Sequence, residues 1–195
     1  MGQDVLQWTN PLLRIAPTQS AHALPFGALR TYGPVPGNRW DPHPPGQPRV
    51  HPPRWGVLYT SSTLTAACAE TSQRTRTIDR HTGAPMVTTW TPTRPLRLLD
   101  LTAGSTWLIR HRAAAALTTG PAPHCQTWAN RIVASLDEVV DGLCVPSVWT
   151  GTNVVLFGPG ANTFPPAPTD RMPLADPALF PVLQKVAVQI GCTLI

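Results

Sequence analysis

The chain has 195 residues, 42% of them hydrophobic, which suffices for one domain with a buried core. Only 13% of the residues are charged, against roughly 25% in an average soluble domain, yet the net charge is +5. The 14 arginines are scattered without a run, which suits a solvated surface with a biased composition, so we expect no direct nucleic-acid binding. A phosphate-bearing small molecule is compatible with this charge. No signal peptide is recognisable and no apolar run reaches ~18 residues, which predicts a cytoplasmic protein without a membrane span.

The first half of the chain predicts two strands, a long loop between them and a helix. The short segment "ALRTYG" at 28–33 stops at Gly-Pro, which predicts a strand. The proline-rich stretch 34–53 predicts an irregular loop, and loops of that length in compact domains are often functional. Aromatic and β-branched residues at 55–60 predict the second strand. Helical spacing of apolar residues predicts a helix from Thr63 to about Arg74.

Strands and helices also mix in the second half. The elements expected there are strands at 86–92 and 96–102, helices at 105–117 (capped by Ser105) and 123–136, strands at 142–149 and 152–158, an irregular proline-rich stretch at 159–181, and a C-terminal helix at about 179–190. Because strands and helices do not alternate strictly, we predict one α+β domain over residues 1–195. Its sheet should be mixed and mostly antiparallel, with flanking helices.

Several common chemistries find no support in the sequence. It contains no GxGxxG or Walker-type phosphate loop and no GxSxG nucleophile elbow. The four cysteines include no CxxC pair, so we expect no metal site, and reduced thiols suit the cytoplasm. No spacing favours a cysteine nucleophile with histidine and asparagine partners.

A dispersed set of polar residues remains, comprising Arg30, Arg39, Tyr59, Glu70 and Ser147. Each residue alone has an ordinary structural interpretation. Arg30 and Glu70 suit surface charges, Tyr59 suits the core, and Ser147 suits a turn. Composition and spacing do not join them.

Taken in chain order, the motifs around these residues resemble the RES-domain family, which is named for an Arg, a Glu and a Ser. The matching pieces are "LRTYG", "GNRWD", "VLYTSSTLTAACAE" and "CVPSVWTGTNVVLF", all within residues 28–157. The chain departs from the family in three ways. The loop after "GNRW" is longer and richer in proline, and Val148 and Trp149 stand where an Arg often follows shortly after the Ser. In addition, Thr31 follows Arg30, and the aromatic residue comes one place later at Tyr32.

The resemblance implies a fold related to ADP-ribosyltransferase toxins, with NAD as substrate and no metal. Family members are typically toxins of bacterial toxin–antitoxin pairs, and they deplete NAD by cleaving its nicotinamide–ribose bond. The implied partner is an Xre-like antitoxin with a segment that plugs the toxin's site. The oligomeric state stays open, a homo-oligomer included.

The resemblance also implies roles for individual residues. The implied catalytic residues are Glu70, Arg30 and Ser147, and the implied NAD contacts are Arg39, Tyr59, Tyr32 and Asn153. These residue types suit the chemistry. A fixed anion stabilises an oxocarbenium-like transition state, an aromatic wall orients nicotinamide, and arginine forks match pyrophosphate oxygens.

Alternatives remain at this level. Attack by water would give a glycohydrolase, and attack by inorganic phosphate as co-substrate would give a phosphorylase. A mono-ADP-ribosyltransferase would use the same NAD site but pass ADP-ribose to a macromolecule. A non-catalytic nucleotide-binding module would leave NAD intact.

Overall fold

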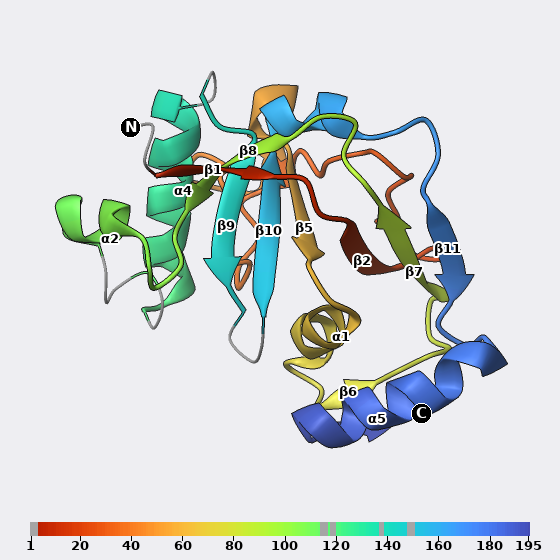
Figure 1. The fold of residues 1–195 in the computed structure, drawn as a ribbon. Helices are drawn as coiled ribbons and strands as arrows, with labels where there is room; N and C mark the ends of the chain where they lie inside the picture. Colours follow the sequence, from red (N-terminus) through yellow and green to blue (C-terminus); the bar gives the residue numbers. More distant parts are fainter. Residues whose placement is uncertain (1–3, 114–116, 118–119, 137–138, 148–150) are drawn as a thin grey trace.

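The computed structural model describes residues 4–113, 117, 120–136, 139–147 and 151–195 (Figure 1). The strands are β1 (Val5–Trp8), β2 (Leu12–Pro17), β3 (Tyr32–Gly33), β4 (Arg49–Val50), β5 (Val57–Ser61), β6 (Thr77–Ile78), β7 (Pro85–Trp90), β8 (Leu96–Asp100), β9 (Gly142–Pro146), β10 (Thr152–Phe157), β11 (Asp170–Pro173) and β12 (Thr193–Leu194). The α-helices are α1 (Leu64–Ser72), α2 (Thr106–Arg110), α4 (Ala122–Leu136) and α5 (Phe180–Ile190). Short 3-10 helices lie at Pro53–Trp55, Gly158–Thr163 and Pro177–Leu179.

An eight-stranded sheet with the order β1-β8-β9-β10-β5-β2-β7-β11 forms the centre of the molecule. Within this sheet β8 and β9 run parallel, and the other neighbouring pairs are antiparallel. The predicted α+β class with a mixed, mostly antiparallel sheet is therefore confirmed.

Apolar side chains alternate between the two faces of the strands, as a pleated sheet requires. On one face Leu143 and Val155 pack with the buried side of α4, including Ile132. On the other face Leu58 and Leu156 join a separate core with Trp90. A third core lies between α1 and α5, which Figure 1 shows together beyond the end of β5.

The sheet divides between β5 and β2. These strands pair at a single position, Leu13 with Ser61, and Figure 1 shows β2 turning away from β5. Farther along β5, the backbone of Arg30 takes the neighbouring place and bridges Val57. This division leaves room for a cleft between the two parts of the sheet.

Three predicted elements differ from the structure. The strand expected at 28–33 is reduced to the Arg30 bridge and the two residues of β3, because this segment folds back to pair with β4 in the proline-rich loop. The helix expected at 105–117 begins after its Ser105 cap but α2 ends at Arg110, since Arg112 adopts a φ of +55° that no α-helix accommodates. The end of the strand expected at 142–149 lies outside the described residues.

Strands β1, β2 and β11 were not predicted. Strand β11 lies in the proline-rich stretch expected to be irregular, and it occupies an edge of the sheet, where a proline such as Pro173 is tolerated.

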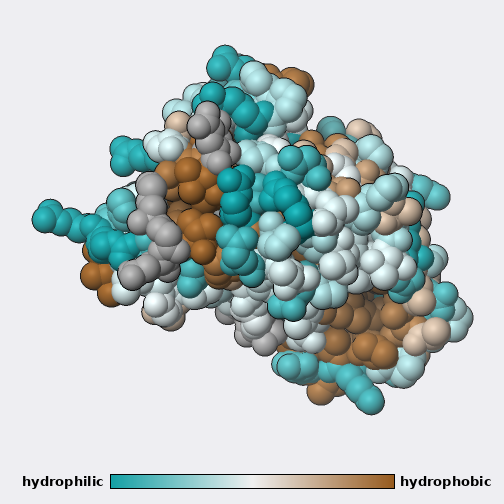
Figure 2. Space-filling view, turned by 45° about the horizontal axis from the view of Figure 1, so that its top comes forward, coloured by the Kyte–Doolittle hydropathy of each residue, from teal (hydrophilic) through white to brown (hydrophobic). Residues whose placement is uncertain are grey.

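All four cysteines are free, and none of the described helices is long and apolar enough to cross a membrane. Figure 2 shows hydrophobic residues gathered in separate areas on one face, with mostly polar residues between them.

Candidate active site

A cleft of about 860 Å³ lies where β5 and β2 separate. Its walls come from β2, β5, β10, the end of α1 and the segment Val35–Trp40 of the proline-rich loop. Small-molecule sites typically have volumes of ~300–1,000 Å³, so the cleft is large enough for an extended ligand.

Glu70 lies in this cleft at the centre of a hydrogen-bonded network. Its Oε1 atom accepts hydrogen bonds from Ser147 Oγ at 2.8 Å and from Asn153 Nδ2 at 2.7 Å. Asn153 Oδ1 in turn accepts a hydrogen bond from Ser61 Oγ at 2.8 Å. Among the described residues, Glu70 has no cationic partner. The carboxylate is thus held in place by neutral donors.

The local sequence places Glu70 by fixing helix α1 tightly. Thr63 caps the helix, because its side-chain oxygen accepts a hydrogen bond from the Ala66 amide at 3.1 Å. Small buried residues, Ala66, Ala67 and Cys68, let the helix pack closely against its neighbours. Glu70 then emerges half-buried on the cleft side, two turns after the cap.

The hairpin of β9 and β10 supplies the partners of Glu70. Asn153 is the register partner of Ser61 on β5, and Ser147 follows the last residue of β9. The backbone amide of Ser147 donates to the Gly151 carbonyl at 3.1 Å, and Gly151 adopts a φ of +73° that favours glycine. The pairing of β9 with β10 therefore brings Ser147 and Asn153 to the same oxygen of Glu70.

Tyr59 forms part of the cleft wall on the same strand as Ser61. Its hydroxyl is buried near the Trp40 backbone, without a hydrogen bond of ordinary geometry among the described residues. Burial, with the nearby charge of Asp41, raises the pKa of Tyr59, so the phenol stays neutral. The ring, and not the hydroxyl, is what Tyr59 presents to the cleft.

Arg30 does not line the cleft among the residues described. Its guanidinium pairs with the buried Asp41 at 2.8 Å and also contacts the Tyr32 carbonyl oxygen. Asp41 accepts further hydrogen bonds from the Val35 amide at 2.9 Å and from the His43 ring. Burial alone would raise the pKa of Asp41, but these donors and the Arg30 charge lower it to about 2. Arg30 thus anchors the loop that forms one wall of the cleft.

Of the other residues predicted to contact NAD, one lines the cleft and another does not. Arg39 lines the cleft, with its guanidinium donating to the Gly120 carbonyl oxygen at 2.6 Å. Tyr32 is 49% exposed and lies outside the lining of the cleft, as far as the described residues show. The structure therefore brings Glu70, Asn153, Tyr59 and Arg39 to the wall of one cleft, with Ser147 hydrogen-bonded to Glu70. Arg30 and Tyr32 lie outside the lining of this cleft among the described residues.

Sequence reasoning missed two arginines of the cleft. Arg74 follows Glu70 by four residues, a spacing that places two side chains on the same side of a helix, and this signal was available. Arg14 lies on β2, a strand that was not predicted. Across the described parts of the chain, no three His, Cys, Asp or Glu side chains gather as a metal site would require.

The fold and the cleft define an α+β protein with a single fixed carboxylate among arginines and aromatic residues. The sequence profile of the RES domain family matches residues 11–175, and the chain belongs to that family. A chain of the M. tuberculosis MbcT–MbcA toxin–antitoxin complex has a similar fold, with a TM-score of 0.57 and 20% identity over 94% of this chain and 93% of that chain. No curated protein sequence matches the chain significantly.

Proposed function

We propose that this protein is a toxin of a bacterial toxin–antitoxin pair and that it cleaves the nicotinamide–ribose bond of NAD. The observation that carries the proposal is the Glu70 carboxylate, fixed by Ser147 and Asn153 and lacking a cationic partner among the described residues. Membership of the RES domain family supports the assignment.

The proposed reaction needs an anion more than a strong acid. The bond between nicotinamide nitrogen and ribose C1′ breaks, and its electron pair neutralises the positive charge of the leaving nicotinamide. Positive charge develops on the ribose, as in glycoside hydrolysis, and Glu70 stabilises it at short range. An oxygen of water or inorganic phosphate then bonds to C1′. Water loses a proton to solvent and gives ADP-ribose, whereas phosphate gives the ADP-ribose phosphate ester.

Cations around the cleft suit the pyrophosphate of NAD. Arg74 lines the cleft just past the end of α1, and Arg39 and Arg14 line other walls. Guanidinium groups bind phosphate oxygens in a bidentate manner, so these residues fix the ligand without taking part in bond cleavage. The rings of Tyr59 and Trp40 provide an aromatic wall for nicotinamide.

Arg30 contributes to this function through the loop wall. Its ion pair with Asp41 holds Val35–Trp40 against the cleft, which makes Arg30 a positioning residue in the proposal. The antitoxin partner is proposed by analogy with the MbcT–MbcA complex, whose chain shares the fold. An Xre-like antitoxin that enters the cleft in the cytoplasm remains the expected form of that partner.

The decisive experiment incubates the purified chain with NAD, in phosphate buffer and in phosphate-free buffer, and identifies the products by mass spectrometry. Release of nicotinamide is expected, with ADP-ribose or its phosphate ester separating hydrolysis from phosphorolysis. E70Q should be inactive, whereas D170N, which changes an exposed carboxylate on β11, should keep the activity. Intact NAD would refute the proposal, and radiolabel from NAD on a macromolecule would replace it with ADP-ribosyl transfer.

A further inference from the structure

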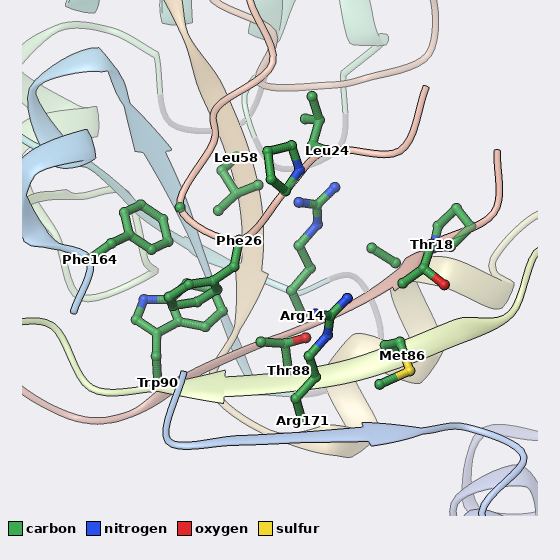
Figure 3. A pocket seen from close by; sticks show the side chains of 14 residues that line it. Arg14, Thr18, Leu24, Phe26, Leu58, Met86, Thr88, Trp90, Phe164 and Arg171 are labelled. Atoms are coloured by element: carbon green, nitrogen blue, oxygen red, sulfur yellow. The ribbon is translucent and has the colours of Figure 1, made fainter. Parts of the chain in front are cut away.

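A second pocket lies against the part of the sheet made by β2, β7 and β11 (Figure 3). Arg14 on β2 and Arg171 on β11 are both register partners of Thr88, which lies on β7 between them. Neighbouring strands lie ~4.8 Å apart, so the two arginine Cα atoms are separated by about 10 Å. Figure 3 shows Arg14, Thr88 and Arg171 rising from the same face of the three strands.

Both arginine side chains line this one pocket. Among the residues described, neither side chain forms an ion pair or a hydrogen bond with a carboxylate. Burial, followed by the nearby charge of Arg30, lowers the pKa of Arg14. Asp170 precedes Arg171 but pairs with Thr89, and alternation along the strand turns it to the opposite face. Like charges that line one pocket repel each other, and an anion bound between them would offset that repulsion.

The rest of the pocket is apolar and firmly packed. Phe26 meets the Trp90 ring edge-on with a centroid separation of 5.6 Å, and Phe164 stacks on Trp90 at 5.3 Å. An apolar wall lowers the local dielectric and strengthens the attraction between a guanidinium and an anion. The cavity of about 40 Å³ holds roughly three waters at ~10–15 Å³ each, which is room for a small oxyanion and too little for a nucleotide base.

We propose that Arg14, Thr88 and Arg171 form a binding site for a phosphate-type oxyanion, either as inorganic phosphate or as the terminal phosphate of a small metabolite. Two guanidinium groups carry two positive charges, which a phosphate dianion matches and a carboxylate does not. The Thr88 hydroxyl donates a third hydrogen bond from the floor between them. The site shares Arg14 with the Glu70 cleft, whereas Arg171 and Thr88 line this pocket alone among the described residues.

The test is calorimetric titration of the full chain with inorganic phosphate at low ionic strength. R171A should weaken binding about tenfold or more, because it removes a charge-assisted hydrogen bond from an exposed edge-strand residue. R131A is the matched control, since it removes an exposed arginine of α4 far from the pocket lining, and binding should stay within about twofold. Acetate, which has a single charge, should not compete at the same concentration. Glucose 1-phosphate, which carries a terminal phosphate, should compete if the source is a metabolite and should not if only the free ion fits.

Three outcomes would overturn the site. They are the absence of phosphate binding, unchanged binding by R171A, and equal competition by acetate. Phosphate binding that survives R171A but is lost in R74A would place the anion in the Glu70 cleft. NAD cleavage provides the separating readout. R171A should keep it, so loss of phosphate binding with intact NAD cleavage distinguishes this site from the proposed catalytic one.

Discussion

Asp141 and Glu70 lie near opposite ends of the hairpin of β9 and β10, and their partners differ in charge. Asp141 immediately precedes β9 and is fully buried. Arg94 binds both of its oxygens, at 2.7 and 2.9 Å, and Arg97 adds its backbone amide at 2.8 Å. Burial alone would raise the pKa of Asp141, but the hydrogen bonds from Arg94 and Arg97 lower it to about 2.

Glu70 meets the other end of the hairpin with a different set of donors. Ser147 and Asn153 are neutral, and the side chain is only half-buried in a cleft. At Asp141 the arginines neutralise the carboxylate, which therefore stabilises the fold and exerts little field outside. At Glu70 the position is equally fixed but the charge is not neutralised. The difference indicates that the partners of a carboxylate, more than its burial, distinguish a structural site from a site for a cationic transition state.

The largest expected effect is that of E70Q on NAD cleavage. Glutamine keeps an oxygen that accepts from Ser147 and Asn153 but removes the charge, so kcat should fall by about 10²–10³-fold. The free energy of unfolding should change by less than ~1 kcal/mol, since the hydrogen bonds persist. Parallel NAD-consumption assays and denaturant titrations measure both quantities. A fully active E70Q would remove Glu70 from the mechanism.

D141N should show the reverse pattern. Removing this charge leaves Arg94 and Arg97 without their anion, and breaking a buried ion pair costs ~3–5 kcal/mol. Both arginine side chains are just over a third exposed, at 38% and 36%, so water replaces part of the loss and we expect about 3 kcal/mol. Denaturant titration of D141N measures this loss in the free energy of unfolding. If D141N lowered kcat of the folded protein as E70Q does, the contrast between the two carboxylates would fail.

Acid should weaken the protein through Asp141 and Asp41, whose folded-state pKa values are each about 2. Because the unfolded pKa of an aspartate is ~3.9, each group contributes stability that is complete above about pH 5 and is lost as the pH falls towards 2. A shift of this size corresponds to about 2.5 kcal/mol per group. Urea titrations at pH 7, 4 and 3 should show the fall, and D141N should show a smaller one. An equal fall in D141N would assign the acid sensitivity elsewhere.

The local sequence pattern predicted the α-helices and five strands of the central sheet, β5 and β7 to β10, because their apolar spacing is strong. It did not predict β2, whose short apolar run follows Asn10-Pro11 and carries Arg14 between apolar residues. Missing that strand concealed both the division of the sheet and the second arginine pocket. These features depend on which strands pair, and strand pairing is a long-range property.

The candidate site shows the same limit. Glu70, Ser147 and Asn153 were grouped by resemblance to a family, since a sequence separation of 77 between Glu70 and Ser147 leaves no local signal. Asp41 as the partner of Arg30 was not predicted, because it depends on how the proline-rich loop folds back. Arg74 was within reach of sequence reasoning, because helical spacing alone relates it to Glu70.

A smaller effect on kcat is expected when a hydrogen bond that holds Glu70 in position is removed, and its size should depend on whether that bond is direct or indirect. Ser147 donates to the carboxylate itself, whereas Ser61 donates to Asn153, one step away. S147A should lower kcat about tenfold, because hydrogen bonds to charged groups contribute ~1.5–3 kcal/mol, and S61A should lower it about threefold or less. Both variants replace a serine by alanine, so each removes one hydroxyl group and the two changes are matched in size. A larger effect from S61A would show that Asn153, and not Ser147, holds Glu70 in position.

The smallest effect is expected at Tyr59, which shares the cleft with Glu70 but has no bonded partner for its hydroxyl in the described structure. Y59F removes a buried hydroxyl that satisfies no hydrogen bond, so stability should be unchanged or rise by up to ~1 kcal/mol. The rate of NAD cleavage should stay within about twofold of the parent if the ring alone orients nicotinamide, and Y59A should lose more than Y59F in KM. A large rate loss in Y59F would mean that the hydroxyl contacts the substrate. The Tyr59 hydroxyl would then be a polar contact to the substrate in addition to those of the Glu70 network.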